Sequence, residues 1–135
     1  MASVVGRLQR ALRTVGPNRA GPRNHRHDLG ALLRCLRAGA CAGRCDGKLL
    51  GLTHYLFHRS TTAIDPVCYL QDLFTDQTAR AKGVGRALIN GVYQQAKLAG
   101  SPRVYWQTHQ TNLTAMKLYD EVAEHSGFVV YRKLF

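Results

Sequence analysis

The chain has 135 residues, of which 45% are apolar, and its formal net charge is +11. This length accommodates one compact domain and excludes two domains of ordinary size. No apolar run approaches the roughly 18 residues of a membrane span, so we expect a soluble protein. The four cysteines and the absence of a secretory h-region favour reduced thiols in a cytoplasmic setting.

The positive charge is concentrated in residues 1–45, which hold nine arginines, no lysine and one acid. The rest of the chain has ten lysines or arginines and seven acids, for a net charge of +3. Ala, Arg, Gly, Pro and Cys make up 27 of the first 45 residues, a composition that buries little surface. We therefore expect an atypical, poorly ordered segment at 1–45 and the working domain at 46–135.

Three alternatives for the first segment can be weighed. Its acid-free opening, "MASVVGRLQRALRTVG", also fits an amphipathic transit peptide. Its arginines could bind nucleic acid, but the aromatic interleaving of such proteins is missing, so this role is disfavoured. The cluster "CLRAGACAGRC" matches none of the paired-ligand patterns of zinc sites, so no metal is expected. Short helices are expected at Val4–Leu12 and Leu29–Leu36.

From Asp46 onward the hydrophobic pattern predicts alternating strands and helices. Asp46-Gly47 is a hairpin turn signal, and the segment 66–75 is apolar on both faces, which is typical of a central strand. The order predicts an α/β domain with at least one parallel crossover. The expected elements are strands at 48–60 and 66–75, a helix at 84–100, a strand at 103–109, a helix within 112–127 and a closing strand at 127–135.

The loop "TDQTARAKGVGRALING" joins the second strand to the first helix and is typical of a phosphate cradle. A P-loop would need Lys and then Ser or Thr after its last glycine, and a dinucleotide fingerprint would need a third glycine where Leu88 stands. Both are excluded. What remains is an Arg80-x-x-Gly83-x-Gly85 loop at a helix N-terminus, where backbone N–H groups can approach a pyrophosphate closely.

This loop and the later stretch "NLTAMKLYDEVAEHSGF" together resemble the GNAT superfamily of acetyl-CoA-dependent N-acetyltransferases, most closely the small histone and polyamine types and their bacterial relatives. The superfamily pairs R/Q-x-x-G-x-G/A with N-x-x-A-x-x-L-Y…G-F. The resemblance covers about residues 46–135. It implies a mixed central sheet with flanking helices, whose usual N-terminal portion is atypical or missing here.

The resemblance also implies roles for individual residues. Acetyl-CoA would be the acyl donor and a primary amine the acceptor, with direct attack in a ternary complex and no metal. Tyr119 would lie near the thioester sulfur as the acid that protonates the leaving thiolate. From the residues alone, Tyr119 could equally be a core tyrosine and Asn112 a helix N-cap. The implied donor-binding residues are Leu73, Phe74, Thr75, Arg80, Ala81, Lys82, Gly83, Val84, Gly85, Arg86 and Asn112.

Several functional points stay open at this level. Cys68 needs no nucleophilic role and is expected to be a buried strand residue. Candidate bases are Asp72, His54 and His109, and the sequence does not choose among them. Because the atypical start falls where the acceptor wall is usually built, an acyl-CoA-binding protein with little catalysis is the alternative function. The closing strand "GFVVYRKLF" could pair with or exchange into a second copy, so a homodimer is expected.

Overall fold

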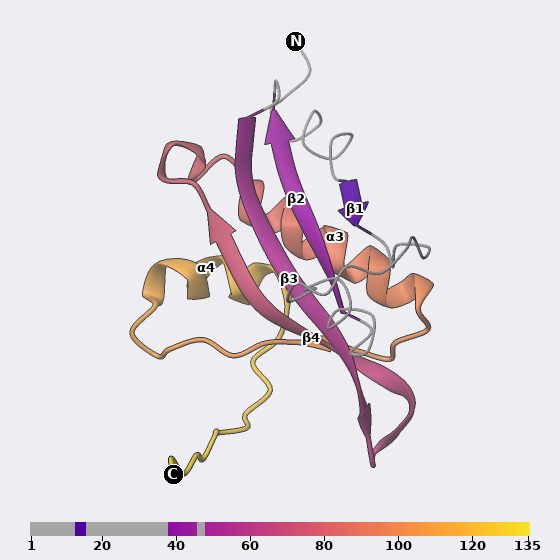
Figure 1. Ribbon diagram of the computed structural model, residues 1–135. Coiled ribbons are helices and arrows are strands. Elements are labelled where there is room, and N and C mark those ends of the chain that lie inside the picture. The colour runs from indigo at the N-terminus through magenta and orange to yellow at the C-terminus, as the bar shows by residue number, and fades with distance from the viewer. Residues whose placement is uncertain (1–12, 16–37, 46–47) are drawn as a thin grey trace.

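The computed structural model describes residues 13–15, 38–45 and 48–135. These residues form a mixed five-stranded sheet in the order β1-β2-β3-β4-β5, flanked by two α-helices (Figure 1). Neighbouring strands are antiparallel except β4 and β5, which are parallel. This confirms the predicted α/β class with one parallel crossover. The strands are β1 (Arg13–Val15), β2 (Ala38–Cys45), β3 (Lys48–Ser60), β4 (Ala63–Thr75) and β5 (Val104–Tyr105).

The hairpin of β2 and β3 lies where the Asp46-Gly47 signal predicted a turn. Cys45 pairs with Lys48. The predicted turn residues 46–47 themselves lie outside the described residues. Strand β2 itself was not predicted, because Ala and Gly carry little β-propensity and only pairing with β3 makes this segment a strand. The two short helices expected within 1–36 also fall outside the described residues.

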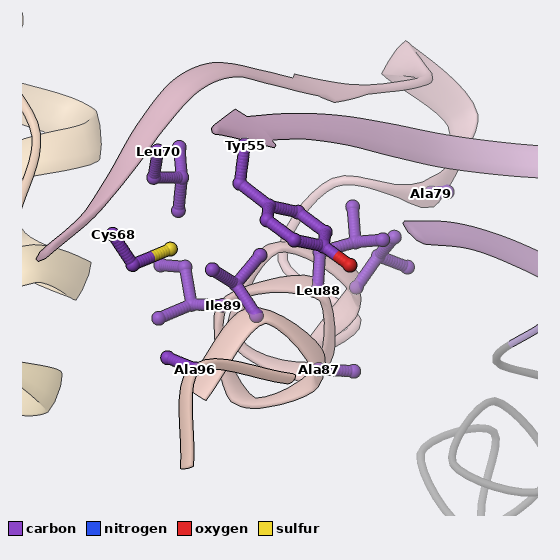
Figure 2. Packing of buried hydrophobic residues seen from close by; sticks show 10 residues of the cluster. Tyr55, Cys68, Leu70, Ala79, Ala87, Leu88, Ile89 and Ala96 are labelled. Atoms are coloured by element: carbon purple, nitrogen blue, oxygen red, sulfur yellow. The ribbon is translucent and has the colours of Figure 1, made fainter. Parts of the chain in front are cut away.

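Helix α3 (Val84–Leu98) lies across one face of the sheet and contacts β2, β3 and β4. Its buried residues recur at helical spacing, as the apolar pattern predicted. Tyr55 and Leu70, from β3 and β4, point toward this helix (Figure 2). Cys68 is fully buried in the same core, as expected for a central strand. The core residues contributed by α3 are Val84, Ala87, Leu88, Ile89, Val92 and Ala96.

Two of the predicted strands differ in the structure: one is shorter than predicted, and the other does not form. The strand expected at 103–109 is only the two residues of β5, and the segment 127–135 forms no strand. Phe128 is 87% exposed. The C-terminal segment runs as an extended tail away from the sheet (Figure 1). Aromatic and β-branched residues favour strands only where a partner edge is available, and this segment pairs with no described strand.

Helix α4 (Leu113–Val122) occupies the middle of the predicted second helix. It ends at Ala123, whose backbone is extended. No residue of α4 is fully buried, so the helix rests on the rest of the fold by a few partly buried side chains. None of the helices among the described residues is long and apolar enough to cross a bilayer.

A pair of leucines on α3 tests this core. Leu88 is 0% exposed and Leu98 is 81% exposed. We expect Leu88→Ala to lower the free energy of unfolding by about 3 kcal/mol, because it leaves a cavity among close-packed side chains. Leu98→Ala should lower it by less than about 0.5 kcal/mol. Urea unfolding followed by circular dichroism measures both, and equal losses would contradict the assigned core.

Candidate functional site

The loop between β4 and α3 is anchored at its start. The backbone N–H of Asp76 donates to the carbonyl of Leu50 on β3 at 2.8 Å. The carboxylate of Asp76 then accepts from the backbone N–H of Thr78 at 2.9 Å and also from the Thr78 hydroxyl. These hydrogen bonds lower the pKa of the Asp76 carboxyl below its ordinary value. They hold the short 3-10 turn η1 (Gln77–Ala79) from which the loop departs.

Two residues of the loop have left-handed backbone conformations. Gly83 has φ 79° and Ala81 has φ 58°. Gly83 adopts this conformation without steric cost, whereas the Cβ of Ala81 meets its own backbone there. The loop therefore carries backbone strain at Ala81, a feature that concentrates at functional sites.

The N-terminus of α3 is open to an anion. Gly83 is the N-cap and makes no side-chain cap, and the first turn has no acidic residue. The Ala87 N–H makes the first helical hydrogen bond, to the Gly83 carbonyl at 3.0 Å, so the preceding N–H groups have no partner within the helix. Arg80 and Lys82 are exposed beside this positive end. These are features that a pyrophosphate group requires.

Arg86 differs from the other loop cations. Its guanidinium forms an ion pair with Glu121 of α4. Its backbone N–H belongs to the open first turn of α3, whereas its side chain contacts α4. The backbone N–H and the side chain of Arg86 therefore have different surroundings in this structure.

The close approach of α4 explains why a residue without a side chain stands at position 85. A Cβ at this position would lie 3.2 Å from Leu118 Cδ2 and 3.7 Å from Thr75 Oγ1. The first contact is tighter than ordinary packing, so with a larger residue at this position the Leu118 side chain would have to shift by a few tenths of an ångström. Gly85 thus has a packing role in addition to any role in approaching a phosphate. Thr75, at the end of β4, lies beside this glycine.

A pocket of about 480 Å³ lies between β4 and the chain that follows β5. Four residues with predicted donor-binding or acid roles line it: Leu73 and Phe74 from β4, Asn112 before α4, and Tyr119 of α4. Thr75 and residues 80–86 are not among its lining residues. The remaining lining residues are Leu70, Gln71, Asp72, Trp106, Gln107, Thr108 and His109.

The pocket exists because β4 and β5 separate. Only Cys68 with Val104 and Tyr69 with Tyr105 are paired between them. From Leu70 onward, β4 keeps β3 on one edge and has no described strand on the other. The unpaired edge leaves backbone polar groups available to a bound molecule.

Tyr119 is held at the pocket by aromatic packing. Its ring lies 5.3 Å from that of Trp106 in an edge-to-face arrangement. The side chain is partly buried and packs against the core. Burial raises the pKa of the Tyr119 phenol, so its hydroxyl stays protonated at neutral pH and can donate.

Asn112 occupies the N-cap position of α4, but its side chain makes no capping bond. Its Nδ2 instead donates to the Thr108 hydroxyl at 3.1 Å, within the pocket wall. The described residues hold no group of three or more His, Cys, Asp or Glu that could bind a metal.

Of the pocket wall formed by residues 106–109, the sequence suggested a role only for His109, as a candidate base. The segment "YWQTH" was predicted as a strand, because its pattern is that of a strand. In the structure it leaves the sheet after Tyr105 and turns its residues toward β4. The clustering of Trp and His just before the Asn112 motif was the available signal.

The sequence model of the acetyltransferase (GNAT) family matches residues 10–123. This chain belongs to that family, as the paired motifs indicated. The match extends into the first 45 residues, which the sequence pattern alone assigned to a separate segment.

Among curated proteins, the D-amino-acid N-acetyltransferase HPA3 of Saccharomyces cerevisiae is 41% identical over 87 residues. The alignment covers 64% of this chain and 54% of the yeast protein, so the chain spans about half of that relative's length.

Solved structures share the fold. An aminoglycoside acetyltransferase, meta-AAC0020, from an uncultured soil metagenomic sample superposes with a TM-score of 0.73 at 16% identity, over 92% of this chain and 95% of that one. The aminoglycoside N-acetyltransferase AAC(6')-Iy in complex with CoA gives 0.64 at 21% identity, over 72% and 66% of the two chains. These likenesses support the GNAT fold.

The strain at Ala81 generates a stability prediction. We expect Ala81→Gly to raise the free energy of unfolding by about 1 kcal/mol, because glycine adopts a positive φ without a Cβ clash. The matched control is Ala99→Gly at the end of α3, where φ is −83° and glycine should lower stability by about 0.5–1 kcal/mol. Thermal and urea unfolding measure both changes. A loss of stability in Ala81→Gly would contradict the left-handed backbone.

Proposed function

We propose that this protein transfers an acetyl group from acetyl-CoA to a primary amine by direct attack in a ternary complex. The observation that carries the proposal is the pocket between the separated strands β4 and β5, which presents the protonated phenol of Tyr119. Family membership supports acetyl-CoA as the donor. We further propose a cytoplasmic location, on the basis of the cysteine usage.

Two parts of the site would each bind a different part of acetyl-CoA. The pyrophosphate would lie on the open N-terminus of α3, between the exposed cations Arg80 and Lys82, with backbone N–H groups of residues 83–86 as donors. The acyl-bearing arm would lie along the free edge of β4 at Leu73, Phe74 and Thr75. Asn112, whose amide already faces the pocket wall, would bind the same arm.

Tyr119 would act when the carbon–sulfur bond breaks. The amine nitrogen forms a bond to the acetyl carbon, and the thiolate leaves as that carbon collapses back to an amide. A thiolate needs a proton or a strong hydrogen bond as it departs, and a neutral phenol in the pocket can provide either. A tyrosine phenol is neutral at physiological pH, and burial raises the pKa of the Tyr119 phenol further.

Tyr119→Phe tests the acid role. We expect kcat to fall by about 10²-fold, the usual contribution of a positioned proton donor, while the Kd for acetyl-CoA stays within about twofold. Thiol release measures turnover, and calorimetry measures binding. The control is Tyr131→Phe, a residue that is 92% exposed, which should leave both unchanged. Wild-type kcat in Tyr119→Phe would remove the acid assignment.

The acceptor panel for this assay follows the names of the relatives: D-amino acids and aminoglycosides, together with polyamines and a lysine peptide. Binding of acetyl-CoA without thiol release for any amine would favour the alternative function, an acyl-CoA-binding protein. Absence of acetyl-CoA binding would exclude both.

We also propose a homodimer formed through the C-terminal segment, residues 127–135. Its apolar side chains are exposed, with Tyr131 at 92% and Leu134 at 77%, and exposed apolar stretches mark interaction sites. We expect a light-scattering mass of twice the 15.0 kDa of one chain. Val130→Asp should return the mass to one chain, whereas Leu98→Asp, on the exposed side of α3, should not. A wild-type mass of one chain would contradict the dimer.

A further inference from the structure

A carboxylate and an imidazole meet at the edge of the pocket. Asp72, on β4, lines the pocket, and its Oδ2 lies 3.3 Å from Nδ1 of His54 on β3. The two side chains are 60% and 48% exposed, so the pair is accessible to a dissolved molecule. No described residue hydrogen-bonds Oδ1 of Asp72 or Nε2 of His54. One carboxylate oxygen and one ring nitrogen therefore remain available.

The backbone is built to place this pair. His54 pairs with Asp72 but Tyr55 pairs with Leu70, so Gln71 is an extra residue and β4 has a bulge there. Bulges re-aim side chains and are frequent beside active sites. The fully buried Thr53 donates its hydroxyl to the Asp72 carbonyl at 2.5 Å, which fixes the backbone just after the bulge.

The hydrogen bond determines which imidazole nitrogen can accept a proton. An ionised carboxylate only accepts hydrogen bonds, so a neutral His54 in contact with it carries its proton on Nδ1. Its lone pair is then on Nε2, the nitrogen that can act as a base. Asp72 would also stabilise the imidazolium that results, as a carboxylate does for the histidine of a catalytic triad.

The other ionisable groups around the pair do not duplicate this arrangement. On β2, the register places Ala40 opposite His54. The same face of β3 carries Leu52 and Leu56 as the nearest neighbours of His54. Asp72 lines the pocket, whereas His54 is not among the lining residues and is connected to the pocket through Asp72. The other ionisable side chains that line the pocket are Tyr119, a proton donor, and His109, whose Nδ1 contacts the Thr111 hydroxyl at 2.7 Å. Within the described residues, only His54 is backed by a carboxylate.

We propose that Asp72 and His54 form the acceptor half of this site, which takes amines that are cationic at neutral pH. Asp72 binds the ammonium group through Oδ1, and His54 removes one proton from it at Nε2, directly or through one water molecule. This inference rests on the proposed transferase function. It identifies the base that the sequence left open among three candidates.

The protons balance in this scheme. The ammonium gives its first proton to His54, and the freed lone pair forms the carbon–nitrogen bond. The carbon–sulfur bond then breaks, the sulfur takes the Tyr119 proton, and the second proton lost by the nitrogen restores the phenol. The imidazolium releases its proton to solvent. The net products are the amide, free CoA and one proton.

The test compares pH profiles of kcat/KM for wild type, His54→Gln and Asp72→Asn with the best cationic acceptor. We expect His54→Gln to lose about 10²-fold in kcat/KM at neutral pH and to change the shape of the pH profile, because it removes the proposed proton acceptor. Its defect should shrink for an acceptor whose amine is unprotonated at the assay pH, which a merely structural role would not produce. Asp72→Asn should raise KM for the cationic acceptor most strongly.

Matched controls separate the possible failures. His125→Gln, outside the pocket lining, should keep the wild-type profile, and all variants should keep the wild-type Kd for acetyl-CoA. A wild-type profile in His54→Gln would overturn the inference while leaving the transferase function intact. If wild type releases no thiol with any amine, the test is the NMR signal of the His54 imidazole. Adding spermidine should shift this signal in wild type and leave it unchanged in Asp72→Asn. No shift in wild type would overturn the proposal.

Discussion

The separation of β4 from β5 is the constraint on which the site depends. Two residue pairs hold these parallel strands together, and after Tyr69 they diverge. Continued pairing would bring the strands to about 4.8 Å and fill the space with backbone. Divergence instead leaves an edge of β4 on one side, residues 106–109 on the other, and Tyr119 and Asn112 from the α4 region at the pocket.

Helix α4 keeps this opening in place through its contacts with α3. Leu118 packs at Gly85, and Glu121 pairs with Arg86 in the first turns of α3. Farther along, the Tyr93 hydroxyl donates to the Val122 carbonyl at 2.9 Å. Because α4 has no fully buried residue, these contacts position Tyr119. The glycine-rich loop and the pocket are therefore linked by side-chain contacts between α3 and α4.

The bulge in β4 allows this one strand to contribute side chains both to the hydrophobic core and to the pocket. Leu70 and Cys68 must face α3 to complete the core. Strict alternation would then decide the direction of every later side chain. The extra residue at Gln71 resets that alternation, so that Asp72 pairs with His54 and reaches the pocket while Leu73 packs against the core again.

The sequence by itself determined the family, the loop and most of the element order. The paired motifs around Gly83 and Tyr119 are local patterns in the sequence. The helical periodicity that begins at Val84 is also local, so it can be recognised without the tertiary structure. The antiparallel pairing of β2 with β3 on either side of Asp46-Gly47 and the central strand β4 followed from the same kind of signal.

Tertiary structure alone decided where strands stop pairing and which side chains meet. The segments 103–109 and 127–135 have strand propensity, yet pairing requires a partner edge that no local pattern can supply. The pairing of His54 with Asp72, 18 residues apart, depends on a register that includes the bulge. The commitment of Arg86 to Glu121 depends on where α4 packs. These contacts join residues that are far apart in the sequence, so no single stretch of the chain can predict them.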